Sequence, residues 1–194
     1  MTCAVIQPKV VCTRRDALTF GLVLTGCCSA ARAQVSAPAR NLRPLAGDLL
    51  VSAKTPDAVP LRPDDVVPSA PQLLAWPKDP ASGAVRDGSR LNQILLLRLG
   101  PESLDAETSA RAAGGVVAYS ATCTHAQCPV TEWRQEAGIL HCPCHGSEFD
   151  PRAGGRVVGG PALRRLPPLP LQLSADGGLE VAQSFLGKIG GQVA

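Results

Sequence analysis

All three histidines of this 194-residue chain, and every cysteine beyond residue 28, fall within a window of 23 residues. The first part of the window reads CTHAQC (residues 123–128), and thirteen residues later the second part reads CPCHGS (residues 142–147). Each part holds a cysteine and a histidine suited to metal binding, so two loops can supply four ligands to one inorganic centre. Two cysteines are then left over, with Cys128 and Cys144 as the candidates. Any fold of this chain must bring the two loops together.

The composition favours an all-β domain. Aromatic residues make up 3% of the chain, and there are 18 prolines and 19 glycines, which is typical of short strands, frequent turns and an aliphatic core. Apolar runs bounded by turn residues predict six short strands. These are 91–99, 116–119, 139–141, 157–158 and a hairpin formed by 169–173 and 179–181. The segment 102–113, between Pro101 and Gly114, is the one predicted helix.

The net charge of +3 resides in the N-terminal segment. Four of the 19 basic residues and one of the 16 acidic residues lie in the first 33 positions, which leaves 15 of each in the rest. A neutral domain with few aromatic residues lacks the basic face that nucleic-acid binding requires. Nucleic acid is therefore excluded as a partner.

Residues 1–33 have the pattern of an export signal. Arg14 and Arg15 precede an uncharged stretch from Ala17 to Ala31, and ARA at 31–33 fits a cleavage site. The paired arginines favour the twin-arginine route, which exports proteins already folded around a cofactor. Two alternatives stay open: lipidation of Cys27 in the sequence LTGC, and a retained leader that attaches the protein to the membrane. We expect the protein in the periplasm or on the periplasmic face of a bacterial inner membrane.

Residues 34–80 hold nine of the 18 prolines. Proline-rich chain forms semi-rigid linkers and is found at sheet edges, so this segment is predicted to be a linker and an edge region outside the central ladder. The functional domain is placed at 81–190.

The CTHAQC and CPCHGS motifs resemble those of Rieske iron–sulfur proteins, in the subgroup with a loop-bridging disulfide that includes the iron–sulfur subunit of quinol–cytochrome c reductases. The resemblance implies an antiparallel β base with a small cluster-binding subdomain at about 120–163. It implies a [2Fe–2S] cluster in which Cys123 and Cys142 bind one iron and His125 and His145 bind the other. It also implies a disulfide between Cys128 and Cys144. Three further residues are implied around the cluster: Ser147, which bonds a cluster sulfur, and Gly160 and Pro161, in a loop that covers it.

The same resemblance implies one-electron transfer, in which the chain serves as a subunit of an oxidoreductase rather than a stand-alone catalyst. The expected donor is a quinol-oxidising cytochrome b or a molybdenum subunit, and the expected acceptor is a c-type cytochrome. A quinol–cytochrome c reductase-like complex is the favoured host. The small subunit of a molybdenum enzyme such as arsenite oxidase and a soluble periplasmic carrier are the alternatives. A zinc-binding module is the non-redox alternative, because zinc accepts four Cys and His ligands.

Two departures from the family pattern affect the expected reduction potential of the cluster and the expected protein partner. Phe149 stands where the family commonly has tyrosine, which removes a hydrogen bond to the cluster and predicts a lower reduction potential. Ala126 and Gln127 replace the usual Leu-Gly, an apolar contact near the quinol site, and this weakens the case for docking on a standard cytochrome b. Outside the motif, we expect a structural role for His141, packing for Trp133 and solvent exposure for the pair Arg164 and Arg165.

Overall fold

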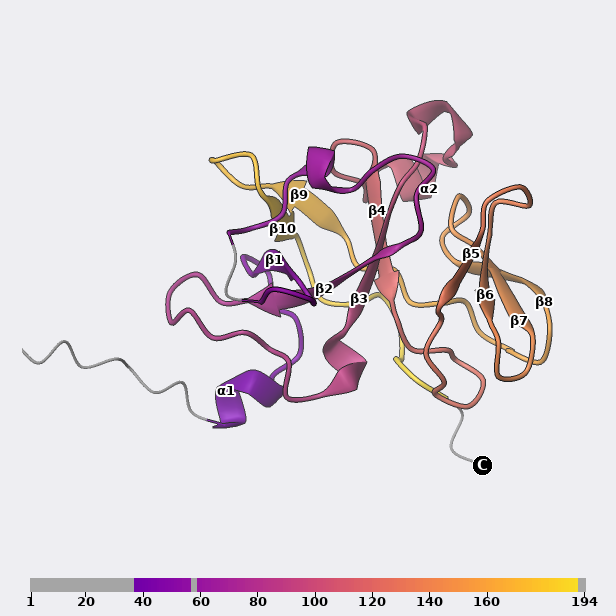
Figure 1. The fold of residues 1–194 in the computed structure, drawn as a ribbon, viewed down its shortest axis with the longest axis horizontal. Coiled ribbons are helices and arrows are strands. Elements are labelled where there is room, and N and C mark those ends of the chain that lie inside the picture. The colour runs from indigo at the N-terminus through magenta and orange to yellow at the C-terminus, as the bar shows by residue number, and fades with distance from the viewer. Residues whose placement is uncertain (1–36, 57–58, 192–194) are drawn as a thin grey trace, which may run out of the picture. The chain divides into compact units, whose positions relative to one another are not determined.

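The computed structural model describes residues 37–56 and 59–191, which form two antiparallel sheets, with short helices before and between the first four strands (Figure 1). The six-stranded base sheet has the order β4-β3-β2-β1-β10-β9. Its strands are β1 (Leu49–Ser52), β2 (Leu73–Lys78), β3 (Ile94–Arg98), β4 (Val116–Ser120), β9 (Leu171–Leu173) and β10 (Leu179–Val181). The smaller sheet consists of β5 (Glu132–Arg134), β6 (Ile139–Cys142), β7 (Ser147–Asp150) and β8 (Arg156–Gly159). The helices are α1 (Ala37–Asn41), α2 (Ala106–Ser109) and three 3-10 turns, η1 (Pro63–Asp65), η2 (Arg90–Asn92) and η3 (Pro101–Ser103). The all-β prediction is confirmed.

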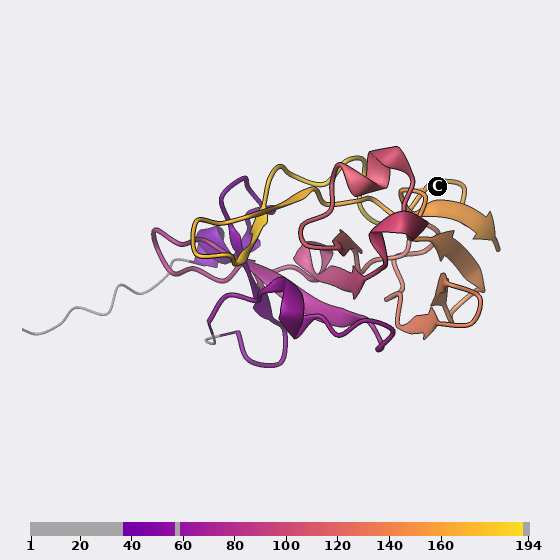
Figure 2. The same cartoon turned by 90° about the horizontal axis from the view of Figure 1, so that it is seen from above.

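Strands β3 and β4 are buried on both faces, which explains their continuous apolar sequences. Because side chains alternate along a strand, Ile94 and Leu96 enter one apolar core with the rest of the base sheet. Leu95 and Leu97 enter a second core, which also contains residues of the smaller sheet. The smaller sheet thus packs through the second core, and Figures 1 and 2 show β5–β8 as a group beside the base sheet.

The expectation that residues 34–80 remain outside the central ladder is wrong for β1 and β2, which lie inside the base sheet. Most prolines of this segment fall in the connections, but Pro77 lies within β2 opposite Leu50 of β1. The pairing of β2 with β3 stops at Ala75, so Pro77 removes no hydrogen bond from that ladder. The leader expected at 1–33 lies outside the described residues, and none of the helices in the described part could span a membrane. The domain boundaries at residues 33 and 80 stay predictions.

The predicted helix at 102–113 is much shorter in the structure. Only Ala106–Ser109 forms an α-helix, which Asp105 caps by accepting a hydrogen bond from the Thr108 amide at 2.7 Å. The capping hydrogen bond also lowers the pKa of Asp105. The chain turns away because Ala113 pairs with Val116 in a tight bridge before β4.

Hydrogen bonds fix the smaller sheet to the base. The buried Tyr119 hydroxyl donates to the Pro151 carbonyl at 2.7 Å, and burial raises the pKa of this hydroxyl, which keeps it a donor. The Thr108 hydroxyl of α2 accepts from the Gly154 amide at 2.8 Å. Together with a hydrogen bond from the Asp105 amide to the Arg152 carbonyl at 3.0 Å, these contacts tie the turn between β7 and β8 to the base.

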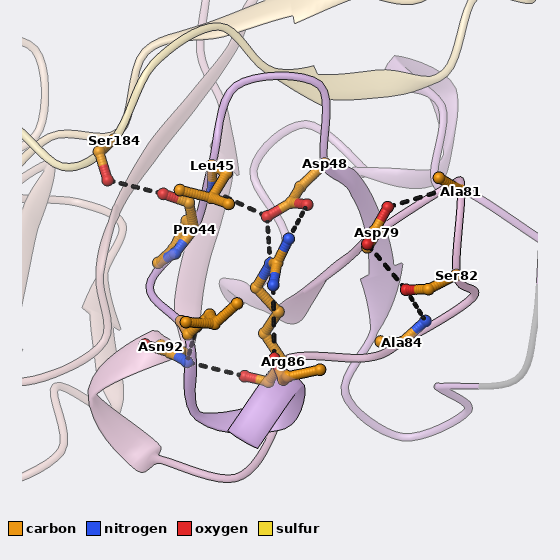
Figure 3. Close-up of polar contacts among 12 residues, drawn as sticks. Pro44, Leu45, Asp48, Asp79, Ala81, Ser82, Ala84, Arg86, Asn92 and Ser184 are labelled. Carbon is orange, nitrogen blue, oxygen red and sulfur yellow. Dashed lines mark hydrogen bonds and ion pairs between the residues drawn. The ribbon is translucent and has the colours of Figure 1, made fainter. Parts of the chain in front are cut away.

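A buried ion pair holds the segment before β1 on the base sheet (Figure 3). Arg86 donates two hydrogen bonds to Asp48, from Nε to Oδ2 at 2.6 Å and from Nη2 to Oδ1 at 2.8 Å, and both side chains are under 5% exposed. Asp48 also accepts from the Leu45 amide at 2.8 Å. Asn92 donates to the carbonyls of Leu42 and Arg86. The pair is fully hydrogen-bonded, as a buried charge must be.

Candidate metal centre

The first loop leaves the buried strand β4 and carries Cys123 and His125. It closes on itself through hydrogen bonds from the Cys123 amide to the Cys128 carbonyl, at 2.8 Å, and from the Gln127 amide to the Cys123 carbonyl, at 3.2 Å. Gln127 adopts φ +60°, a left-handed conformation that is unfavourable for a residue with a side chain. The usual Leu-Gly of the family would place a glycine here, so the departure noted in the sequence falls on a strained position.

The second loop is the turn of the β6–β7 hairpin. Cys142 ends β6 and pairs with Ser147, which begins β7, while residues 143–146 form the turn. The Gly146 amide donates to the Cys142 carbonyl at 3.0 Å. Cys142 is therefore on the rigid strand, whereas Cys144 and His145 lie in the exposed turn.

A third segment, after β8, packs against the second loop. Gly160 has φ +76°, and a Cβ atom added there would lie 2.2 Å from the Gly146 carbonyl oxygen and 2.5 Å from the Ser147 Cα. Glycine is required on both counts. The predicted covering loop is thus placed beside the motif, with Pro161 exposed next to it.

The two predicted cysteine ligands are free thiols, each 1% exposed. Burial raises the pKa of Cys142, and the neighbouring Cys123 raises it further, against the opposing effect of the backbone amides at Cys144 and His145. Metal binding requires the thiolate, so a cation that binds Cys142 displaces the proton that burial favours.

The two predicted histidine ligands face each other, with ring centroids 4.7 Å apart and the rings nearly perpendicular. Nδ1 of His125 and Oγ of Ser147 are buried and have no hydrogen-bond partner among the described residues. Buried polar atoms are almost always satisfied. Oε1 of Gln72 and Nε1 of Trp133 also lack a partner among these residues, and what distinguishes the atoms of His125 and Ser147 is their place in the two motifs that carry the free thiols. The residues present fit a [2Fe–2S] cluster: two thiols, two imidazoles and one hydroxyl that lacks a partner.

The predicted disulfide between Cys128 and Cys144 is present and joins the two loops across a Cα–Cα distance of 6.4 Å. The sulfur atoms of Cys128, Cys142 and Cys144 lie within 4.8 Å of one another, the one compact group of metal-capable atoms found in the described chain. Two of these sulfurs are bonded to each other and cannot act as thiolates. The compact group therefore does not replace the four predicted ligands, which the two irons of a cluster would share in pairs.

Removing the disulfide is expected to destabilise the domain without deleting a ligand. The bond links positions 16 apart, for which the loss of loop entropy corresponds to about 3 kcal/mol of unfolding free energy. We expect Cys128→Ser/Cys144→Ser to lower the urea midpoint accordingly and to shorten the lifetime of the bound metal. An unchanged midpoint would show that the loops are held by packing alone.

Four side chains outside the proposed ligand set were singled out in the sequence, and the structure shows what each contacts. Nδ1 of His141 lies 2.8 Å from Glu132 on the neighbouring strand, and Trp133 packs on the second core. Arg165 is half exposed and lies 4.0 Å from Glu107 of α2. Arg164 departs from the expected solvent exposure: it is partly buried and hydrogen-bonds to the carbonyls of Lys188 and Gly190. No sequence pattern indicated this contact, because the partners are backbone atoms.

Comparison with known proteins matches the chain to one family. A family model described as "Rieske [2Fe-2S] domain" matches residues 92–170, which include both ligand loops. The cytochrome bc1 complex Rieske iron–sulfur subunit of Streptomyces lividans is 35% identical over 150 residues, which cover 74% of this chain and 85% of that protein.

Two further similarities are more partial. A Haloferax mediterranei protein named as a respiratory nitrate reductase subunit of Rieske type is 42% identical over 106 residues, 54% of this chain and 47% of that protein. The chain thus spans about half the length of this relative. The solved structure of a cyanobacterial plasma membrane Rieske protein from Synechocystis is 28% identical, with 57% of this chain and 84% of that chain covered and a TM-score of 0.37.

Proposed function

Because this chain belongs to the Rieske [2Fe–2S] protein family, we propose that it is an exported one-electron carrier and the redox subunit of a quinol–cytochrome c reductase-like respiratory complex. The family makes it an electron-transfer protein. Its export, periplasmic location, host complex and ligand assignment are the parts that we propose.

One observation carries the ligand assignment: among the described residues, Nδ1 of His125 and Oγ of Ser147 are buried without a hydrogen-bond partner, in the same two motifs as the buried free thiols. Cys123 and Cys142 would hold one iron, and His125 and His145 the other. When bound, the cluster supplies a site that accepts and releases one electron at a time. The disulfide keeps the loops together, the Gly160 backbone covers the second loop, and the exposed turn presents His145 to a partner.

The host proposal rests on the Streptomyces relative, which is named as a subunit of a cytochrome bc1 complex and is matched over most of its length. In that host, a quinol-oxidising cytochrome b would be the donor and a c-type cytochrome the acceptor. A second host, a molybdenum or other terminal oxidoreductase, is favoured by the name of the Haloferax relative and by Ala126 and Gln127 in the first loop.

The function is tested in two steps on the full chain. Iron, sulfide and zinc are assayed in the purified protein, and low-temperature EPR is recorded after reduction. Iron and sulfide in equal amounts with a reduced-state signal are expected, whereas stoichiometric zinc without iron would contradict the proposal. Copurification from native membranes then identifies the partner chains: a cytochrome b supports the first host and a molybdenum subunit the second.

Hydrogen bonds near the cluster are expected to set its potential. Ser147→Ala removes the buried hydroxyl, and Phe149→Tyr adds one at a buried position of the same apolar core. Hydrogen bonds that stabilise the reduced form raise the potential, so we expect the first variant to lower it and the second to raise it. Each shift should be on the order of 60 mV, a factor of ten for a one-electron couple. Potentiometry checks this, and shifts of the same sign in both variants would refute it.

A further inference from the structure

The end of the described chain lies along the first ligand loop. We call residues 187–191 the C-terminal strap, and in Figure 1 this yellow segment reaches the loop between β4 and β5. Gly190 and Gly191 are buried, and a Cβ atom added to Gly191 would lie 2.6 Å from the carbonyl oxygen of His125. The strap therefore contacts the backbone of a proposed ligand directly.

Arg164 provides the hydrogen bonds that hold the strap. Its guanidinium donates to the Lys188 carbonyl at 3.0 Å and to the Gly190 carbonyl at 2.9 Å, and no other hydrogen bond to residues 187–191 occurs within the described part of the chain. The backbone of Arg164 is bound to the first loop as well, because its carbonyl accepts from the Thr124 hydroxyl at 2.6 Å. One residue thus connects the strap to the ligand loop.

Gln127 forms the other side of the contact. Cβ positions on Gly190 and Gly191 would lie 3.2 and 3.3 Å from the Cγ of Gln127, so the glutamine side chain packs closely on the strap. Gln127 does so from a left-handed backbone conformation that glycine would adopt without strain. Strain of this kind persists where surrounding contacts require the residue.

We propose that Arg164 and Gln127 are positioning residues, which clamp the C-terminal strap on the first ligand loop and thereby hold His125 in place. The proposal rests on the assignment of His125 as a ligand. His145 lies in the disulfide-linked exposed turn, so the strap supports the histidine on the opposite loop. The two imidazoles would then be positioned by different parts of the chain.

Hydrogen exchange of the full chain gives the first test, since local opening of the loop exposes its hydrogen-bonded amides at Cys123 and Gln127. Arg164→Ala is expected to speed exchange across 121–130 by roughly tenfold or more, because the two charge-assisted hydrogen bonds that hold the strap on this loop are lost. Arg165→Ala is the matched control and should leave exchange of this peptide unchanged.

Gln127→Gly tests whether the strap holds the first ligand loop, because the rate of hydrogen exchange in the loop should change in opposite directions in the two cases. If the strap plays no part, the variant only relieves strain, and exchange of the loop should slow or stay constant. If the strap holds the loop, exchange should speed up in spite of the relaxed backbone. Slower or unchanged exchange in both Gln127→Gly and Arg164→Ala would overturn the proposal.

A spectroscopic measurement separates this proposal from the ligand assignment. In wild-type protein, iron content and EPR are measured first, and their absence would refute the assignment of His125 whatever the exchange rates show. With the cluster present, Arg164→Ala and Gly191→Ala are expected to shift or broaden the EPR g-values. Gly100→Ala, at a glycine of φ −62° whose added Cβ meets only the flexible Glu102 side chain, should not alter them. Wild-type g-values in both strap variants would show that the strap does not position His125.

Discussion

Replacing His145 by leucine is expected to reduce the iron content from about two atoms per chain to nearly none and to abolish the EPR signal of the reduced protein. The reason is chemical rather than structural. His145 lies in the exposed turn of a hairpin, so an apolar side chain there removes a ligand nitrogen without disturbing the core. Far-ultraviolet circular dichroism should remain that of the wild type, and iron analysis with EPR measures the loss.

His141 offers a matched control four residues away. Its ring nitrogen hydrogen-bonds Glu132 and the residue is 8% exposed, and His141→Gln introduces a side-chain amide that can donate to the same carboxylate. We expect this variant to keep its iron. Loss of iron from His141→Gln, or its retention in His145→Leu, would show that the ligand assignment is wrong.

The serine variants of the disulfide distinguish a cluster from a zinc ion held by the compact sulfur group. A zinc ion in the compact sulfur group would need Cys128 and Cys144 as thiolates, so Cys128→Ser/Cys144→Ser would abolish metal binding. With a cluster on Cys123, Cys142 and the two histidines, the same variant keeps both irons and only becomes less stable. Metal analysis of this variant therefore separates a cluster from a zinc ion in the compact sulfur group, and the iron and sulfide assay separates a cluster from zinc on the four predicted ligands.

The candidate site could be located from the sequence because its metal-capable residues are concentrated. The cysteines and histidines of a 23-residue window leave few arrangements, and strands β4 and β6 end where the apolar runs end, just as the motifs begin. Alternation and turn residues also predicted the β9–β10 hairpin, whose strands pair as expected. Apolar runs, alternation and turn residues therefore predicted the strands and hairpins whose partners are close in the sequence.

The wrong predictions concern segments whose structure depends on contacts with residues distant in the sequence. Proline content indicated an edge for 34–80, but Pro77 is accepted inside the base sheet since its ladder with β3 has already ended. The helical pattern at 102–113 yields one turn because pairing before β4 competes with it. The contact of Arg164 with the strap depends on backbone carbonyls 24 and 26 residues away, which no side-chain pattern reveals.

Arg86→Met is expected to lower the unfolding free energy by about 3–5 kcal/mol, because it leaves the Asp48 carboxylate buried without a counter-charge. The hydrogen bonds that Arg86 donates to Asp48 raise the pKa of Arg86, so the guanidinium of the folded protein stays charged at all ordinary pH values. For a domain of this size the melting temperature should fall by roughly 10 °C. Urea unfolding followed by circular dichroism measures the change, and the cluster should stay intact in the folded fraction.

The nearby exposed pair supplies the control for this prediction. Arg40 lies 2.7 Å from Asp87 with its side chain about half exposed, so Arg40→Ala should give no measurable change. Combining Arg86→Met with Asp48→Asn removes both charges and keeps an acceptor for the Leu45 amide, and stability should recover in part. If the double variant is as unstable as Arg86→Met alone, the loss comes from packing, and the uncompensated carboxylate is not its cause.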